Sequence, residues 1–254
     1  MSNTNSYILY EGPSMLDGAP IVVIATGFDD TSENDKTGGM IQTFIIRSDI
    51  EPTEAIKTGD DASVCGDCIH RGDGMGKDRT CYVNIGQSVL SVYRAYKRGS
   101  YRRWPGGGAT GRKIRLGNYG DPMAAPITVW VEFVEGADGL TGYTHQWQRV
   151  HPGTLLHHLF SSLCMASVDT PEQARAAQEA GWRYFRVALP SQAQRMQGET
   201  LCPASEQAGR IKNCDTCLAC SGKSRGFTRS IYIPAHGNSA VMANVRKRDA
   251  ALTA

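Results

Sequence analysis

The residues best suited to chemistry in this chain are its cysteines, because seven of the eight fall into two short clusters. The spacings are C-x2-C-x12-C in the first cluster and C-x11-C-x2-C-x2-C in the second. Reduced thiolates at such spacings are typical ligands of zinc and of iron–sulfur clusters. We name these groups the first thiol set (Cys65, Cys68 and Cys81) and the second thiol set (Cys202, Cys214, Cys217 and Cys220).

The second thiol set is the stronger signal, because four thiolates complete the coordination of either a structural zinc ion or a 4Fe–4S cluster. A group of buried thiols without metal is the weaker interpretation. The first thiol set leaves two interpretations open. If His70 supplies a fourth ligand, the site is closed like a structural zinc site, and if it does not, one metal position stays open, as catalysis requires.

Other polar or thiol side chains near these clusters have ordinary structural interpretations. Asp67, Asp73 and Asp78 lie in the loop of the first thiol set and are expected to be solvated rather than to bind metal. Cys164 stands alone in an apolar segment, which favours a packed, small hydrophobic residue.

Composition places the chain among globular proteins with reduced cysteines. It has 254 residues, 41% of them hydrophobic, and a formal net charge of +2. We expect a cytoplasmic protein of a bacterial host cell, because no basic stretch followed by an apolar run begins the sequence and no apolar stretch reaches the length of a membrane span, roughly 20 residues. We expect a single domain, 1–254, with N-terminal strands (1–50), a first cysteine loop (60–85), a βα core (86–190), and a second cysteine loop (200–225) followed by a C-terminal strand and helix.

Hydrophobic patterning predicts an α/β fold with a largely parallel sheet, as a partial or full (βα) barrel with cysteine-rich metal-binding loops. After the N-terminal strands and the polar stretch 29–39, expected to be a hairpin loop or flap, strands and helices alternate, which is typical of βαβ units. The predicted strands are 7–10, 21–26, 41–47, 113–119, 140–144, 164–168, 184–189 and 229–233. The predicted helices are 87–98, 124–134, 155–160, 171–180 and a tail from 240 onward.

The segment LGNYGDPM follows a predicted strand, at the edge where parallel sheets bind ligands. Gly117 and Gly120 allow a ligand to approach the backbone, and Asp121 is placed to meet an amine or a ribose hydroxyl. In the alternative interpretation Asp121 caps the next helix and Pro122 takes its first position. The two interpretations are compatible.

Four further residues lie near predicted strand ends, and none is specific alone. His145 and His236 are candidates for substrate binding, although each fits a turn or core position equally well. Asp169 and Arg186 occupy comparable positions, and a structural ion pair between them would account for both.

Positive charge is concentrated in segment 94–115, within a stretch from 82 to 120 that contains no acidic residue. Aromatic side chains are interleaved with it, which favours binding of nucleic acid by charge and stacking. The alternative is that the cations complement a helix end and are otherwise solvated. The cations are Arg94, Lys97, Arg98, Arg102, Arg103, Arg112, Lys113 and Arg115, and the aromatic residues are Tyr93, Tyr96, Tyr101 and Trp104.

Several stretches together resemble a group of phage- and plasmid-encoded proteins of unknown function, related to the phage "gene product 88" domain. They are CGDCIHR, CYVNIGQ, IRLGNYGDP, GYTHQW, CPAS with NCDTCLACSG, and IYIPAHG, which span most of residues 40 to 237. The order of elements is also similar to that of radical S-adenosylmethionine enzymes, although their cysteine loop is C-x3-C-x2-C.

The second resemblance implies that the first thiol set holds a 4Fe–4S cluster whose open iron takes S-adenosylmethionine, with Gly120 and Asp121 meeting that cofactor. The second thiol set would hold an auxiliary cluster. The leading hypothesis is an iron–sulfur enzyme of this kind, acting on nucleic acid or a nucleotide. The alternatives are a zinc-stabilised nucleic-acid-binding protein without catalytic activity and, ranked last for want of a general base, a zinc hydrolase.

Overall fold

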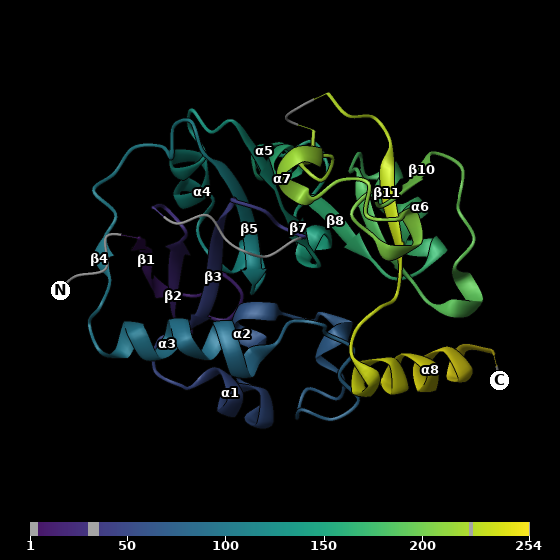
Figure 1. Cartoon of the computed structure of the whole chain (residues 1–254), viewed down its shortest axis with the longest axis horizontal. Helices are drawn as coiled ribbons and strands as arrows, with labels where there is room; N and C mark the ends of the chain where they lie inside the picture. The colour runs from purple at the N-terminus through teal and green to yellow at the C-terminus, as the bar shows by residue number, and fades with distance from the viewer. Residues whose placement is uncertain (1–4, 30–35, 224–225, 254) are drawn as a thin grey trace.

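The strands of the computed structural model, which describes residues 5–29, 36–223 and 226–253, form two sheets (Figure 1). In spatial order the first sheet comprises β4 (Arg102–Arg103), β1 (Ser6–Pro13), β2 (Pro20–Thr26), β3 (Ile41–Arg47), β5 (Lys113–Tyr119) and β6 (Gly139–Thr141). The second comprises β10 (Glu199–Leu201), β11 (Ser230–Pro234), β9 (Tyr184–Ala188), β8 (Met165–Val168) and β7 (Tyr143–Thr144).

Strand direction confirms the α/β class. The second sheet is parallel throughout, and in the first sheet β3, β5 and β6 are parallel, whereas β1, β2 and β3 are antiparallel neighbours. The antiparallel pairing of β2 with β3 agrees with the expected hairpin. Residues 30–35 of the expected loop or flap at 29–39 lie outside the described residues.

The predicted strand 140–144 is divided at Gly142, where the chain passes from the first sheet to the second. β6 pairs with β5 and β7 pairs with β8. The Gly142 amide donates to the carbonyl of Cys220 at 3.0 Å, and its carbonyl accepts from Met165 at 2.9 Å. The second cysteine loop is therefore hydrogen-bonded, through Cys220, to the residue at which the chain passes between the two sheets.

Helices cover both sides of the first sheet (Figure 1), and residues 21–25 of β2 are accordingly fully buried. A strand buried on both faces carries a continuous apolar run, which is what the sequence of β2 shows. On one side lie α1 (Pro52–Thr58), α2 (Ala62–Cys65) and α3 (Leu90–Lys97), and on the other lies α4 (Ile127–Phe133). The first two were not predicted, because each is too short to show helical periodicity.

Helix α4 begins three residues later than predicted because Pro126 interrupts the predicted segment 124–134. Pro122–Ala124 forms a 3-10 turn, and the residue before Pro126, Ala125, is held in an extended conformation with φ −105° and ψ 154°. A residue that precedes proline avoids the helical region, so a helix from residue 124 cannot continue through 126.

The remaining helices are α5 (Leu155–Leu163), α6 (Pro171–Glu179), α7 (Cys214–Cys217) and α8 (Ser239–Thr253). Helix α6 begins as predicted, with the Thr170 side chain accepting from the Gln173 amide. Helix α8 runs beside the first cysteine loop (Figure 1), where Asn244 donates to the Arg79 carbonyl at 2.8 Å and Lys247 pairs with Asp78 at 2.8 Å. Within the described part of the chain no helix is both long and apolar enough to cross a membrane.

Candidate metal centres

A closed loop brings the first thiol set together despite the twelve residues between its second and third cysteines. Cys65 ends α2, and the amide of Cys68 donates to its carbonyl at 3.3 Å. The carbonyl of His70 accepts from the amides of both Thr80 and Cys81, at 3.2 and 3.1 Å. Residues 71–79 thus form a loop whose two ends are joined by these hydrogen bonds, which place Cys81 near Cys65 and Cys68.

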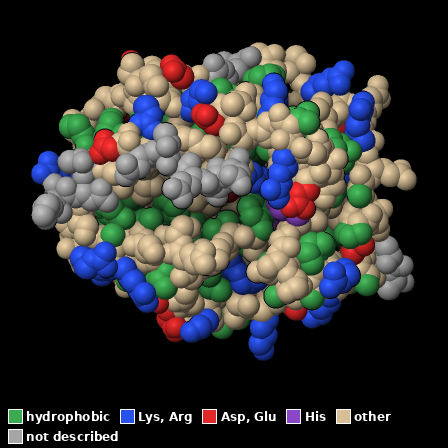
Figure 2. Space-filling model, in the orientation of Figure 1, with side chains coloured by type: hydrophobic (Ala, Val, Ile, Leu, Met, Phe, Trp, Pro, Cys, Tyr) green, Lys and Arg blue, Asp and Glu red, His purple; other side chains and the backbone are tan. Residues whose placement is uncertain are grey.

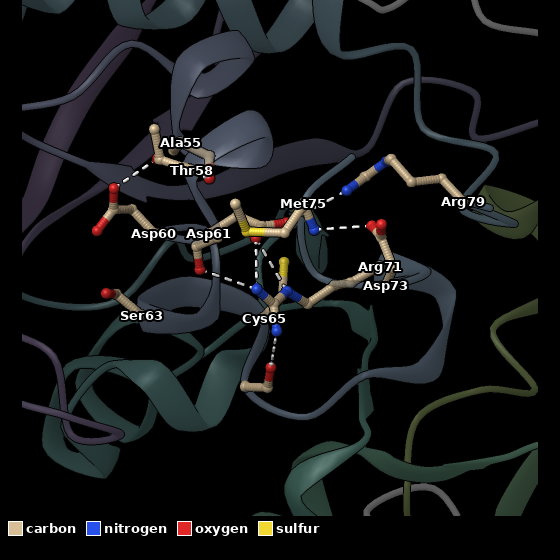
Figure 3. A network of polar contacts seen from close by, with 12 residues as sticks. Ala55, Thr58, Asp60, Asp61, Ser63, Cys65, Arg71, Asp73, Met75 and Arg79 are labelled. Atoms are coloured by element: carbon tan, nitrogen blue, oxygen red, sulfur yellow. Dashed lines mark hydrogen bonds and ion pairs between the residues drawn. The ribbon is translucent and has the colours of Figure 1, made fainter. Parts of the chain in front are cut away.

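Asp61 is hydrogen-bonded to both ends of segment 71–79 (Figure 3). Its carboxylate, 1% exposed, accepts from Arg71 Nε at 2.9 Å, from Arg71 Nη2 at 2.6 Å and from Arg79 Nη1 at 3.2 Å. Arg71 also donates to the carbonyls of Gly59 and Gly66. Arg71 and Arg79 are the first and last residues of segment 71–79, so one buried carboxylate contacts both of its ends.

The first thiol set opens onto a cavity of about 150 Å³ at the carboxyl ends of strands from both sheets. Burial, together with the charges of Cys68, Asp61 and Cys81, raises the pKa of the Cys65 thiol well above its usual value. Burial likewise raises the pKa of Cys81. A bound cation reverses this effect by stabilising the thiolates. The other lining residues include Gly117, Gly120, Asp121, Tyr143, His145, Ser167, Phe185, Val187, Val245 and Arg248.

His70 lines the same cavity, and its two ring nitrogens face other side chains. Nδ1 lies 2.7 Å from Thr80 Oγ1, and Nε2 lies 2.9 Å from Asp169 Oδ1. The ligation of a metal by His70 together with the three thiols stays a prediction. His145 Nε2 lies between two groups, 3.8 Å from Cys68 Sγ and 3.6 Å from Asp169 Oδ2.

Asp169 and His145 are electrostatically complementary. Burial acts to raise the pKa of Asp169, but the adjacent His70 and His145 outweigh it and hold that pKa far below its usual range. For His145 burial acts to lower the pKa, and the neighbouring Cys68 and Asp169 together raise it well above its usual value. Asp169 and His145 each follow a predicted strand, and parallel packing of β7 and β8 is what makes them neighbours.

The turn at 117–121 lines the cavity, and its side chains also serve the fold. Gly117 and Gly120 have φ of 63° and 81°, and a Cβ at either would lie 2.6 Å from a backbone oxygen. The Asp121 carboxylate, 6% exposed, accepts from the amide of Met123 (2.9 Å), the hydroxyl of Thr144 (2.7 Å) and the amide of His145 (2.8 Å). Asp121 therefore caps the 3-10 turn Pro122–Ala124, with Pro122 at its first position, and not α4, which begins at Ile127. A contact of Asp121 with a cofactor stays a prediction.

The second thiol set surrounds a smaller cavity of about 30 Å³. Cys202 follows β10, Cys214 and Cys217 begin and end α7, and Cys220 lies in the loop fastened at Gly142. Burial raises the pKa of Cys220 well above its usual value; the adjacent Tyr143 acts to lower it, and the other three thiols of the set raise it further. All eight cysteines are free of disulfides.

Arg183 holds the second cysteine loop as Asp61 holds the first. Its guanidinium, on a residue 6% exposed, donates to the carbonyl of Ala219 at 2.8 Å and also to the carbonyls of Gly222 and Arg229. One buried cation thus satisfies three backbone carbonyl groups, those of Ala219, Gly222 and Arg229.

The two cavities adjoin, because six residues line both. They are Tyr82, Arg115, Tyr143, Phe185, Val187 and His236. Arg115 is 7% exposed, and its guanidinium lies 5.8 Å from the ring centroid of Tyr143. Burial acts to lower the pKa of Arg115, and the neighbouring Tyr82, Tyr143 and Cys214 keep it above its usual value. A buried cation therefore lies in the wall between the two thiol sets.

The basic segment 94–115 is divided between the surface and the interior. Arg94 and Arg103 form exposed ion pairs with glutamates, whereas Arg112 donates to backbone carbonyls of 27, 28 and 39. Lys113 pairs with Asp215 at 3.2 Å. Figure 2 shows Lys and Arg side chains spread around one face of the molecule, with Asp and Glu among them.

Several residues at strand ends and in loops have structural partners. The suggested pairing of Asp169 with Arg186 is wrong: Arg186 forms a fully buried ion pair with Glu199, its Nε 2.7 Å from Oε1. Asp67 and Asp73 are exposed, as expected; Asp67 also accepts from Gln146 at 2.6 Å, and Asp73 accepts from two loop amides. Cys164 is fully buried, as expected of a packed residue.

The fold and the sites define a mixed α/β protein with two adjoining cavities, each lined by one set of thiols. Comparisons of the chain with protein-family models, with curated proteins and with solved structures found no match. Function is therefore inferred from the residues and geometry of this chain.

Proposed function

We propose that this protein binds two iron–sulfur clusters and is an enzyme similar to the radical S-adenosylmethionine enzymes. The observation that carries the proposal is the difference between the two thiol sets. Three thiols line the larger cavity and four surround the smaller one. Three thiolates leave one iron of a 4Fe–4S cluster available to a ligand, whereas four complete its coordination.

The spread of the sulfurs supports clusters over single zinc ions. In a tetrahedral zinc site with Zn–S distances near 2.3 Å, the sulfurs lie roughly 3.8 Å apart. Among the residues that the structure describes, no three thiol sulfurs lie within 4.8 Å of one another. A cubane core places one iron at each thiolate and so holds its ligands further apart than a single ion does.

Cofactor binding at the first cluster is supported by the turn at 117–121, which lines the cavity of the first thiol set. In this proposal Gly117 and Gly120 present backbone groups to S-adenosylmethionine, and Asp121 fixes the turn while facing the same cavity. The cofactor at an open iron would supply one-electron chemistry. The parallel strands β3, β5 and β6, followed by the second sheet from β7 to β10, would correspond to the partial barrel that the resemblance implies.

Nucleic acid or a nucleotide is the proposed substrate class. Arg248 of α8 lines the cavity and would contact a phosphate, while Arg98 and Arg102 are exposed cations of the basic segment. The cavity of about 150 Å³ is smaller than small-molecule sites of about 300–1,000 Å³. Admission of a nucleotide would therefore require α8, which contributes Val245 and Arg248, to move aside. A cytoplasmic location in a bacterial host, where thiols stay reduced, belongs to the same proposal.

The test is iron, zinc and acid-labile sulfide analysis with a visible spectrum, on protein purified without oxygen. We expect roughly eight iron and eight sulfide per chain for two 4Fe–4S clusters. C81A and C217A should each lose about half of both. C164A is the matched control, because Cys164 belongs to neither thiol set, and it should keep the full content.

The enzymatic part of the proposal is tested by cleavage of S-adenosylmethionine under reducing conditions. C81A should abolish cleavage, and C217A should retain it, because only the first cluster is proposed to have an open iron. Equal activity in C81A and wild type would contradict the assignment. Two zinc ions per chain without visible absorption would instead leave a zinc-stabilised protein, to be tested for salt-dependent binding of nucleic acid.

A further inference from the structure

A second type of ligand group lies beside the first thiol set and contains no sulfur. One ring nitrogen of His70, one ring nitrogen of His145 and a carboxylate oxygen of Asp169 all lie within 4.8 Å of one another. The three side chains come from the first cysteine loop, from the end of β7 and from the end of β8. Asp169 is 3% exposed, and the two histidine side chains are 14% and 21% exposed.

The closest contact in this group joins two buried atoms. His70 Nε2 and Asp169 Oδ1 are 2.9 Å apart, an ion pair when the imidazole is protonated, and neither atom has a further hydrogen-bond partner. His70 Nδ1 lies 2.7 Å from Thr80 Oγ1, which fixes the ring orientation in the way that an outer partner fixes a metal-binding histidine. A proton on Nε2 would pair the imidazole with the carboxylate. In the tautomer with the proton on Nδ1, the Nε2 lone pair and the carboxylate oxygen are both available to one metal ion.

The separations match those of ligands around one metal ion. Nitrogen and oxygen ligands at about 2.0–2.2 Å from a metal lie roughly 3.0 Å apart in octahedral geometry and roughly 3.4 Å apart in tetrahedral geometry. Here His70 Nε2 lies 2.9 Å from Asp169 Oδ1, and His145 Nε2 lies 3.6 Å from the other carboxylate oxygen, Oδ2. Arg248 approaches the same carboxylate only to 4.0 Å, which leaves the carboxylate lone pairs available.

We propose that His70, His145 and Asp169 bind one divalent first-row transition-metal ion. Two imidazoles and one carboxylate suit Fe²⁺, Mn²⁺ or Zn²⁺ and leave coordination positions free. Those positions face the cavity, because both histidines line it. The site adjoins the first thiol set, with Cys68 Sγ 3.8 Å from His145 Nε2, but it does not depend on what the thiols bind.

The test uses Mn²⁺, because thiolates select soft ions whereas carboxylate ligands suit Mn²⁺. Full-length protein is titrated with Mn²⁺ without oxygen, and free Mn²⁺ is followed by its electron paramagnetic resonance signal. We expect one Mn²⁺ per wild-type chain, and D169N and H70Q should each weaken binding by at least about 100-fold. D78N and H158Q are the matched controls, because both residues are exposed and lie outside the group.

The outcomes separate this site from the proposed clusters. Iron and sulfide are measured on the same samples, and D169N should keep its cluster content while losing Mn²⁺ binding. A protein without clusters that still binds Mn²⁺ through Asp169 would overturn the proposed function and retain this site. Wild-type protein that binds no Mn²⁺ below about 1 mM, or folded D169N and H70Q that both bind it like wild type, would overturn the site. Circular dichroism establishes folding, and H70Q serves alone if D169N does not fold.

Discussion

Substitution of Asp61 by asparagine should destabilise the first cysteine loop strongly. Asparagine keeps the shape of the side chain but removes the charge that faces Arg71 and Arg79 at distances of 2.6 to 3.2 Å. Removal of one partner from a buried ion pair costs about 3–5 kcal/mol. The two arginine side chains are 14% and 17% exposed and so partly solvated, which favours the lower end, about 3 kcal/mol.

This loss is measurable as a change in thermal stability. For a chain of this size, 1 kcal/mol corresponds to about 2–4 °C in Tm, so D61N should melt about 6–12 °C lower, followed by circular dichroism. D78N is the matched control on the same loop: Asp78 and Lys247 are 50% and 68% exposed, and such pairs contribute about 0–1 kcal/mol. If D61N and D78N had the same Tm, the Asp61 carboxylate would not be the group that stabilises the loop.

Two further substitutions test the second half of the chain. E199Q should leave the Arg186 guanidinium buried without a counter-charge and cost about 3–5 kcal/mol in urea unfolding, because both side chains are fully buried; an unchanged urea midpoint would contradict the buried ion pair. R183M should remove the donors to the carbonyls of Ala219, Gly222 and Arg229, cost about 2–4 kcal/mol, and halve the metal content while the first thiol set keeps its share. Full metal content in R183M would show that the second thiol set binds its metal without the hydrogen bonds from Arg183.

The regular elements were predictable where local sequence decides them. β3 and β5 have the predicted bounds, because each is a run rich in β-branched or apolar residues that ends at a polar or glycine-containing stretch. The start of α6 was also predictable, since Thr170 and Pro171 are a cap and a first-turn residue. These signals need no knowledge of the rest of the chain.

Features that depend on distant partners were not predictable. The division of strand 140–144 depends on the Gly142 hydrogen bonds to Cys220 and Met165, although a glycine within a strand was a signal for an interruption. The partner of Arg186 is Glu199, which belongs to a strand too short to be recognised. Similarly, His70, His145 and Asp169 were noted singly, and only the packing of β7 against β8 and the closure of the cysteine loop make them one group.

Because the first cysteine loop is closed by hydrogen bonds at His70, the position of Cys81 does not depend on how many residues lie between His70 and Thr80. The amides of Thr80 and Cys81 are held by one carbonyl, and the amide of Asp73 donates to the carbonyl of Lys77 at 3.1 Å, which leaves residues 74–76 as a tip. Insertions or deletions in that tip would change the spacing between the second and third cysteines without moving Cys81. Homologous chains with the same site are therefore expected to differ in this spacing, and a search that fixes it at twelve residues would overlook them.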